Sequence, residues 1–76
     1  MPPFYFDVIH DQQPSPQVAS DLPDRDTAWS QAVRAAGDMI RDLGPRFRPG
    51  TEWRMDVADD TRRRIFSLRL IGEWLD

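Results

Sequence analysis

The adjacent pair His10–Asp11 is the feature of the chain most similar to half of a catalytic site. A histidine oriented by a carboxylate can act as a general base in nucleophilic catalysis. Adjacent residues of an extended strand point to opposite faces, so this pair cannot form the required hydrogen bond without a bend. The chain has no second histidine and no cysteine. The sequence therefore predicts a strand end, with Asp11 starting a turn through a hydrogen bond to its own backbone, and no catalytic residues.

Aspartates form a second group with possible chemistry. Asp59 and Asp60, near Asp56, could bind a hard cation such as calcium or magnesium. Their spacing lacks the ligand series of a dedicated loop, and aspartates are ordinary turn residues. We therefore predict neither a metal site nor a cofactor. Helix capping and turn formation account for most of the aspartates that could otherwise serve general acid–base chemistry, namely Asp7, Asp21, Asp24 and Asp26.

All ten basic residues are arginine, and several lie in or near the segment "TRRRIF". Arginines interleaved with aromatic residues on a sheet could contact phosphates and stack on bases. Neighbouring arginines in one strand project to opposite sides, and nearby aspartates cancel part of their field. We interpret the segment as a solvated hairpin end. The alternative, a nucleic-acid contact, would use Arg46, Arg48, Arg54, Arg62, Arg63 and Arg64.

Length and charge narrow the classes of function. Seventy-six residues form at most one domain, spanning 1–76, with a small core. Without cysteine, disulfides and thiolate metal sites are excluded, so oligomerisation is the common remaining source of stability. The net charge of −3 is opposite in sign to that of most free-standing nucleic-acid binders. The N-terminus lacks the features of a signal peptide, and no run approaches the roughly 20 apolar residues of a membrane span. We expect a cytoplasmic protein without membrane contact.

The N-terminal half predicts two strands. Residues 3–9 are aromatic and β-branched, as in a strand. Residues 17–20 predict a short strand at a sheet edge, because prolines flank it. Alternation divides the first strand into two faces, with Phe4, Phe6 and Val8 on one and Tyr5, Asp7 and Ile9 on the other.

A helix is predicted after the second strand. Asp24 can cap its N-terminus, and Gly44 followed by Pro45 ends it. Asp26 lies favourably in its first turn. Apolar residues recur at helical spacing and predict a core-facing stripe made of Trp29, Val33, Ala36, Ile40 and Leu43. Ala28, Ala32 and Met39 widen this stripe.

The C-terminal third predicts a β-hairpin. "TEWRMDVA" alternates strictly, and "RIFSLRL" has the pattern of its partner strand. The final "IGEWLD" is predicted to form a helical turn that tucks Trp74 and Leu75 against the core. A loop centred on Asp60–Thr61 sets the register, with Met55 opposite Phe66, Trp53 opposite Leu68 and Glu52 opposite Arg69.

The resulting order is β(β)αββ. It predicts a two-layer α+β sandwich, in which three or four antiparallel strands carry one helix on one face. The other face mixes apolar and charged residues, which suggests a partner or self-association surface. This candidate interaction surface comprises Tyr5, Ile9, Arg54, Ile65, Arg69 and Trp74.

Three stretches resemble the short bacterial proteins grouped as domain of unknown function 6894. They are "MPPFYFDV", "DLPDRDTAW" and "VADDTRRRIFSL", which together extend over nearly the whole chain. The resemblance supports the fold and implies no activity or catalytic residue. Two departures concern turns: Arg62 stands where the family has a hairpin glycine, and "QQPSPQ" replaces the glycines usual near the first turn.

Together these observations favour a non-enzymatic protein-interaction or regulatory module that acts as a homodimer, with an unidentified protein as a further partner. The alternative is a nucleic-acid-binding module that uses the arginine cluster. An enzyme would need residues lent by another chain, because no complete catalytic set is present.

Overall fold

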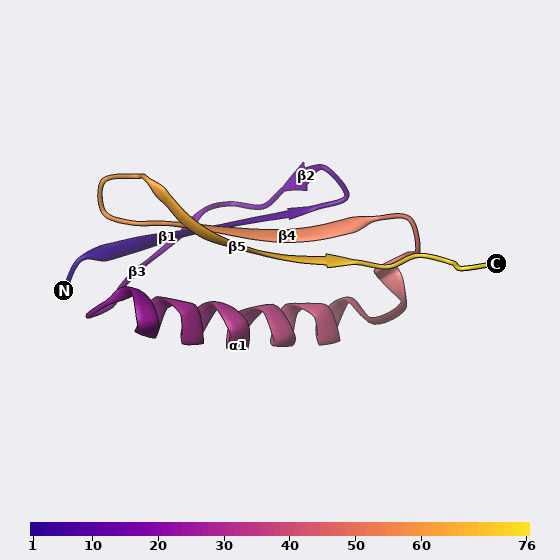
Figure 1. Ribbon diagram of the computed structural model, residues 1–76, viewed down its shortest axis with the longest axis horizontal. Helices are drawn as coiled ribbons and strands as arrows, with labels where there is room; N and C mark the ends of the chain where they lie inside the picture. Colours follow the sequence, from indigo (N-terminus) through magenta and orange to yellow (C-terminus); the bar gives the residue numbers. More distant parts are fainter.

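The computed structural model describes residues 1–76 and has two layers, an antiparallel sheet and one helix packed on one of its faces (Figure 1). The predicted α+β class is therefore correct. The sheet order is β2–β1–β4–β5, and β3 also pairs with β1 at the β2 edge. The elements are β1 (Pro3–His10), β2 (Gln13–Pro14), β3 (Val18–Asp21), α1 (Arg25–Leu43), the short 3-10 helix η1 (Gly44–Arg46), β4 (Glu52–Ala58) and β5 (Arg64–Ile71).

Helix α1 has the predicted ends. The Asp24 carboxylate accepts a hydrogen bond of 2.8 Å from the backbone N–H of Thr27, which satisfies a free donor of the first turn. Gly44, with φ of 53°, ends the helix in a conformation that glycine adopts at low cost. Its N–H donates to the carbonyl of Ile40.

The most buried residues of α1 lie at the margin of the predicted stripe, not at its centre, although Ala36, Ile40 and Leu43 of the stripe do pack against the core. Ala28 and Ala32 are fully buried, whereas Trp29 and Val33 are 46% and 48% exposed. Small alanines at the contact allow the helix to approach the sheet closely, so the larger side chains lie on the flank. The prediction that Trp29 and Val33 lie in the core was therefore wrong, although Trp29 still contacts Phe66 edge-on, with ring centroids 5.0 Å apart.

The core lies between α1 and the two central strands. Its largest members come from β1 and β4, with Trp53, Met55 and Val57 almost completely buried. A helix is about 10 Å wide, whereas four strands at about 4.8 Å span about 19 Å. One helix therefore leaves both margins of the apolar face partly uncovered.

The β1–β2 turn corrects one expectation. Asp11 and Gln12 both have positive φ, 52° and 68°, and His10 pairs with Gln13. This is the geometry of a two-residue type I′ hairpin turn. The Asp11 side chain makes no hydrogen bond, so the predicted bond to its own backbone was wrong; instead its N–H donates to the carbonyl of Glu52 at 3.0 Å.

The β4–β5 hairpin is confirmed, but its register differs from the prediction by two residues. Met55 is opposite Leu68, and Arg54, not Glu52, is opposite Arg69. The shift arises because the loop is longer, with Arg62 in the left-handed region at φ 69° and a bulge between Val57 and Ala58. A shift of two residues keeps each side chain on its face.

The last residues do not form the predicted helical turn. Gly72 to Asp76 have no regular secondary structure, and Trp74 and Leu75 are 74% and 94% exposed. The expected packing of this segment against the core was therefore wrong. None of the helical structure is long and apolar enough to span a membrane.

Candidate interaction surface

The face of the sheet opposite α1, here called the open face, carries four of the six predicted surface residues. Tyr5 and Ile9 alternate with the buried β1 residues, and Ile9 pairs with Arg54, which in turn pairs with Arg69. Ile65 is a correction, because the bulge turns it toward α1, where it packs against the core. Trp74 lies beyond β5. The predicted set is therefore divided among three places.

A polar cluster covers Tyr5 on the open face. The Arg62 guanidinium lies 3.8 Å from the centre of the Tyr5 ring and donates to Gln17 Oε1 at 3.0 Å. Gln17 Nε2 donates to both carboxylate oxygens of Asp7, each at 3.0 Å. These contacts hold the hairpin loop to β1 and to the segment before β3. Consequently Tyr5 is not part of a free apolar patch.

The carboxylate of Asp56 is the one buried charged group, 6% exposed, and it lies on the open face. Ser67 Oγ donates to it at 2.5 Å, and Arg54 Nε lies 3.2 Å away. Arg64 approaches at 3.9 Å, so the negative charge is neutralised locally.

Arg69 has neither an ion pair nor a side-chain hydrogen bond, although the like-charged Arg54 is directly opposite it.

Several exposed apolar residues lie on or beside β5, whereas Val18 and Met39 are exposed at the opposite edge of the sheet. We call Trp29, Val33, Leu70 and Ile71 the β5 strip; they are 46%, 48%, 40% and 57% exposed. A groove of about 330 Å³ separates α1 from β5 within it, and Gly37 forms part of its helix wall. The buried Trp53 and the partly buried Leu68 contribute to its lining. Strand β5 pairs only with β4, so its outer edge is open (Figure 1).

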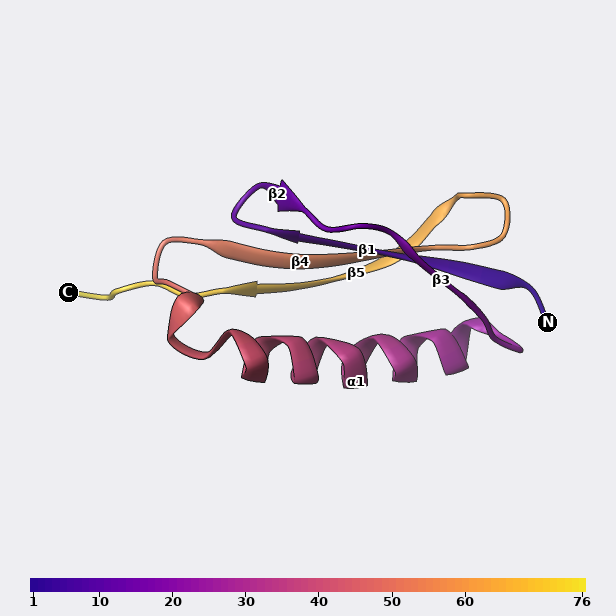
Figure 2. The same cartoon turned by 180° about the vertical axis from the view of Figure 1, so that it is seen from behind.

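The opposite edge of the sheet is differently arranged. Strands β2 and β3 lie there, and Figure 2 shows them in front of β1. A second apolar groove, of about 280 Å³, lies between α1 and this edge, with Val18, Ala35 and Met39 among its lining residues. The segment from Ser15 to Ser20 closes part of it. This edge is shorter and interrupted by prolines, unlike β5.

The predicted arginine cluster is two separate groups. Arg46 donates to the carbonyls of Asp42 and Leu43 at the C-terminal end of α1, and Arg48 follows it. The hairpin loop with Arg62 lies at the other end of a molecule 46 Å long (Figure 1). The six arginines therefore do not form one continuous surface.

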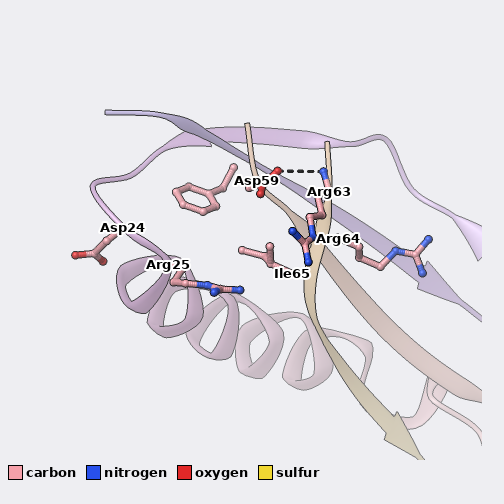
Figure 3. Close-up of a pocket in the computed structure, with 7 residues that line it drawn as sticks. Asp24, Arg25, Asp59, Arg63, Arg64 and Ile65 are labelled. Carbon is pink, nitrogen blue, oxygen red and sulfur yellow. Dashed lines mark hydrogen bonds between the residues drawn. The ribbon is translucent and has the colours of Figure 1, made fainter. Parts of the chain in front are cut away.

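The fold does bring Arg25 of α1 to the hairpin arginines. A cleft of about 520 Å³ lies between them, with Phe4 and Ile65 in its lining. Figure 3 shows the side chains of Arg25 and Arg63 directed toward Ile65, whereas Arg64 extends away from the cleft. No feature of the sequence linked Arg25 to the hairpin, because residues 25 and 63 are far apart along the chain.

Two carboxylates that line the cleft have lowered pKa values. The backbone N–H of Thr27, together with the Thr27 side chain, lowers the pKa of Asp24 below its ordinary 3.8. The Thr61 hydroxyl is the main cause of the lowered pKa of Asp59, and the backbone N–H groups of Arg63 and Thr61 add to it. Two carboxylates and three arginines line the cleft, so its charge is mixed.

The chemistry-bearing residues of the sequence do not assemble elsewhere. His10 stacks at an angle against Phe47, with ring centroids 5.9 Å apart, and no serine or threonine hydroxyl donates to it. Nowhere in the structure do three or more histidine or acidic side chains lie close enough together to bind a metal ion. Asp59, considered for a cation, instead accepts hydrogen bonds from Thr61 and from the backbone of Arg63.

Comparison with known families gives one result. Residues 4–71 match a family model described as Domain of unknown function (DUF6894). The comparisons with curated proteins and with solved structures gave no match. The matched range begins in β1 and ends with β5, so it includes α1, every strand of the sheet and the β5 strip. The chain therefore belongs to the family described as Domain of unknown function (DUF6894).

Proposed function

We propose that this protein is a non-enzymatic interaction module that acts as a homodimer, and that its interface is the outer edge of β5 with the β5 strip. The observation that carries the proposal is the coincidence of an unpaired edge strand with exposed apolar side chains from a second element. Val33 of α1 and Leu70 of β5 line one groove, Trp29 of α1 packs on Phe66 of β5, and Ile71 lies on the open face, opposite Glu52.

The open edge supports this proposal on physical grounds. An unpaired strand presents free N–H and C=O groups that another chain can pair with. Natural edge strands are commonly protected by charged side chains, proline, a β-bulge or a covering loop. β5 has no proline, its bulge lies at its N-terminal end, and Arg69 is the one charged residue from Ile65 to Ile71. A chain of 76 residues also gains from oligomerisation, because its own core is small.

The experiment compares two charge insertions on opposite flanks of α1. Val33→Glu places a carboxylate in the β5 strip, whereas Gln31→Glu places one on the flank that faces the β3 edge. Both positions are exposed, so neither change should unfold the protein. We expect sedimentation equilibrium to show that Val33→Glu raises the dimer dissociation constant at least tenfold and that Gln31→Glu changes it less than twofold. Equal effects, or a monomer in every sample, would contradict the proposal.

A nucleic-acid-binding role is the second candidate, favoured by the convergence of Arg25 and Arg63 on the cleft. It predicts binding that weakens steeply as salt is raised. Fluorescence anisotropy with single- and double-stranded RNA and DNA at low salt tests it. Signals that stay flat with all four ligands would eliminate this role, and the mixed charge of the cleft leads us to expect that result.

A further inference from the structure

An uncompensated arginine on the open face indicates how the two copies pair. Arg54 and Arg69 are directly opposite each other on β4 and β5, a like-charged arrangement that destabilises a sheet. Arg54 is compensated by Asp56 and Glu52. Arg69 has no such partner, and it lies on the strand whose outer edge is open.

From Phe66 to Leu70 the side chains of β5 alternate between the two faces, whereas the bulge turns Ile65 toward α1 and Ile71 lies on the open face, opposite Glu52. Ser67 and Arg69 lie on the open face, paired with Asp56 and Arg54. Phe66, Leu68 and Leu70 lie on the α1 side, paired with the buried residues of β4. Any second strand added to this edge must therefore match a polar face and an apolar face at once.

We propose that two copies pair β5 to β5 in antiparallel orientation, about a two-fold axis level with Leu68, so that Arg69 of each copy reaches Asp56 of the other. The inference rests on the proposed homodimer and specifies its geometry. Opposing residues of antiparallel strands share a face, so the axis must lie level with a residue, not between two.

Three positions of the axis are available near the middle of β5, and charge decides among them. An axis at Arg69 would place the two copies of this arginine opposite each other, beside two Arg54 side chains. An axis at Ser67 would place Arg69 opposite Ile65, which has no partner on β4, so no carboxylate would lie in the row of Arg69. An axis at Leu68 sets Ser67 opposite Arg69 and Phe66 opposite Leu70, which matches the faces in the middle of the strand; at its ends Ile65, turned toward α1, is opposite Ile71 of the open face.

The Leu68 axis also brings a carboxylate into the row of Arg69, namely Asp56 of the second copy, which Arg69 would share with the Arg54 and Arg64 of that copy. Across the joined sheet it creates the row Arg54, Arg69, then Ser67 and Asp56 of the second copy. Asp56 already extends toward β5, since it accepts the Ser67 hydroxyl. Two strand spacings, roughly 10 Å, separate the backbones of Arg69 and Asp56 of the second copy. The long arginine side chain and the carboxylate can together bridge that separation.

Gly37 provides an independent observation on the helix side. A Cβ built at Gly37 meets no atom within 4 Å, so packing within one copy does not require glycine there. Glycine in a helix interior is nonetheless unfavourable relative to alanine. In the joined sheet the two α1 helices flank the axis, where helices pack about 8–10 Å apart. A residue without a side chain on this flank lets them approach.

The absence of cysteine makes single-cysteine cross-linking a clean test. Ser67→Cys and Arg69→Cys are exposed substitutions. In the proposed register they are directly opposite only when the two variants are mixed, with Cβ atoms close enough for a disulfide. Light scattering first establishes the oligomeric state of each sample, and oxidation with a mild copper catalyst then measures cross-linking.

We expect the mixture to form a disulfide-linked heterodimer at least tenfold faster than either variant forms a homodimer. Faster cross-linking of Ser67→Cys alone would place the axis at Ser67 and overturn the inference. A dimer by light scattering without any cross-linking would overturn this geometry while leaving the proposed homodimer standing. A monomer at every concentration up to millimolar would overturn both.

Discussion

Arg62 occupies a backbone conformation that costs free energy, and its replacement tests how the hairpin is built. Its φ of 69° lies in the left-handed region, where a residue with a side chain pays about 1–2 kcal/mol. The conformation is held by the loop, in which the Arg62 N–H donates to the Asp59 carbonyl at 2.9 Å. The contacts of the Arg62 side chain offset part of this cost.

The magnitudes can be separated with two variants. Arg62→Ala keeps the strained backbone and loses both the cation–π contact with Tyr5, worth about 0.5–1 kcal/mol at an exposed site, and the hydrogen bond to Gln17, worth about 1 kcal/mol. We therefore expect it to lower the free energy of unfolding by about 1.5–2 kcal/mol. Arg62→Gly loses the same contacts but relieves the backbone strain. The gain from this relief is reduced by about 0.4–1 kcal/mol, because glycine gives the unfolded chain greater conformational freedom.

The glycine variant should accordingly be more stable than the alanine variant by about 0.5–1 kcal/mol. In a domain of this size, 1 kcal/mol corresponds to a difference of about 4–8 °C in Tm. Urea denaturation followed by tryptophan fluorescence, at one fixed protein concentration, measures both variants. An alanine variant as stable as the glycine variant, or more stable, would refute the claim that the loop requires a left-handed residue at this position.

Three further predictions concern the tryptophans, the acidic caps and Gly37. Trp29→Ala should lower the free energy of unfolding by about 1–2 kcal/mol, because the half-exposed indole packs edge-on against Phe66. Trp74→Ala should change it by less than about 0.5 kcal/mol, because Trp74 is exposed. Thermal denaturation compares the two variants, and equal losses of stability would contradict the placement of Trp74 in the solvent. Because the pKa values of Asp24 and Asp59 are lowered in the folded protein, the two carboxylates stabilise the fold fully above the ordinary value of 3.8, and this stabilisation is lost as the pH falls through the lower folded values. In an acid titration, Asp24→Asn and Asp59→Asn should therefore each flatten the dependence of stability on pH below pH 4. A dependence as steep as that of the unmodified protein would refute the role of these two residues. Gly37→Met should stabilise the dissociated chain by up to about 1 kcal/mol, because methionine has the higher helix propensity. The same change should raise the dimer dissociation constant at least tenfold in sedimentation. Unchanged or tighter dimerisation would contradict the proposed contact between the two α1 helices.

The local elements follow from the sequence because their determinants are local. The cap at Asp24, the end of α1 at Gly44 and the alternation of β1 each depend on neighbouring residues. The face of α1 that is buried could not be obtained in the same way. Two stripes one residue apart both contain apolar side chains, and the tight contact of Ala28 and Ala32 with the sheet decides between them.

The register of the hairpin and the position of the candidate surface required the structure. Favourable pairing of Glu52 with Arg69 suggested one register, but the loop geometry at Asp59 and Arg62 outweighs a single exposed charge pair. The bulge then moves Ile65 to the other face. The β5 strip was missed because it joins α1 to β5, although the edge position of the last predicted strand was a signal that could have indicated it.

The most direct test of the β5 interface is backbone amide hydrogen exchange of the unmodified protein, measured by NMR at micromolar and at millimolar concentration. We predict that amides within residues 66–70 become more protected at the higher concentration, since pairing with a second copy satisfies the outer edge of β5. Amides of β3, at the other edge of the same sheet, should not change. Protection in β5 that is independent of concentration, or concentration-dependent protection in β3 alone, would contradict the account.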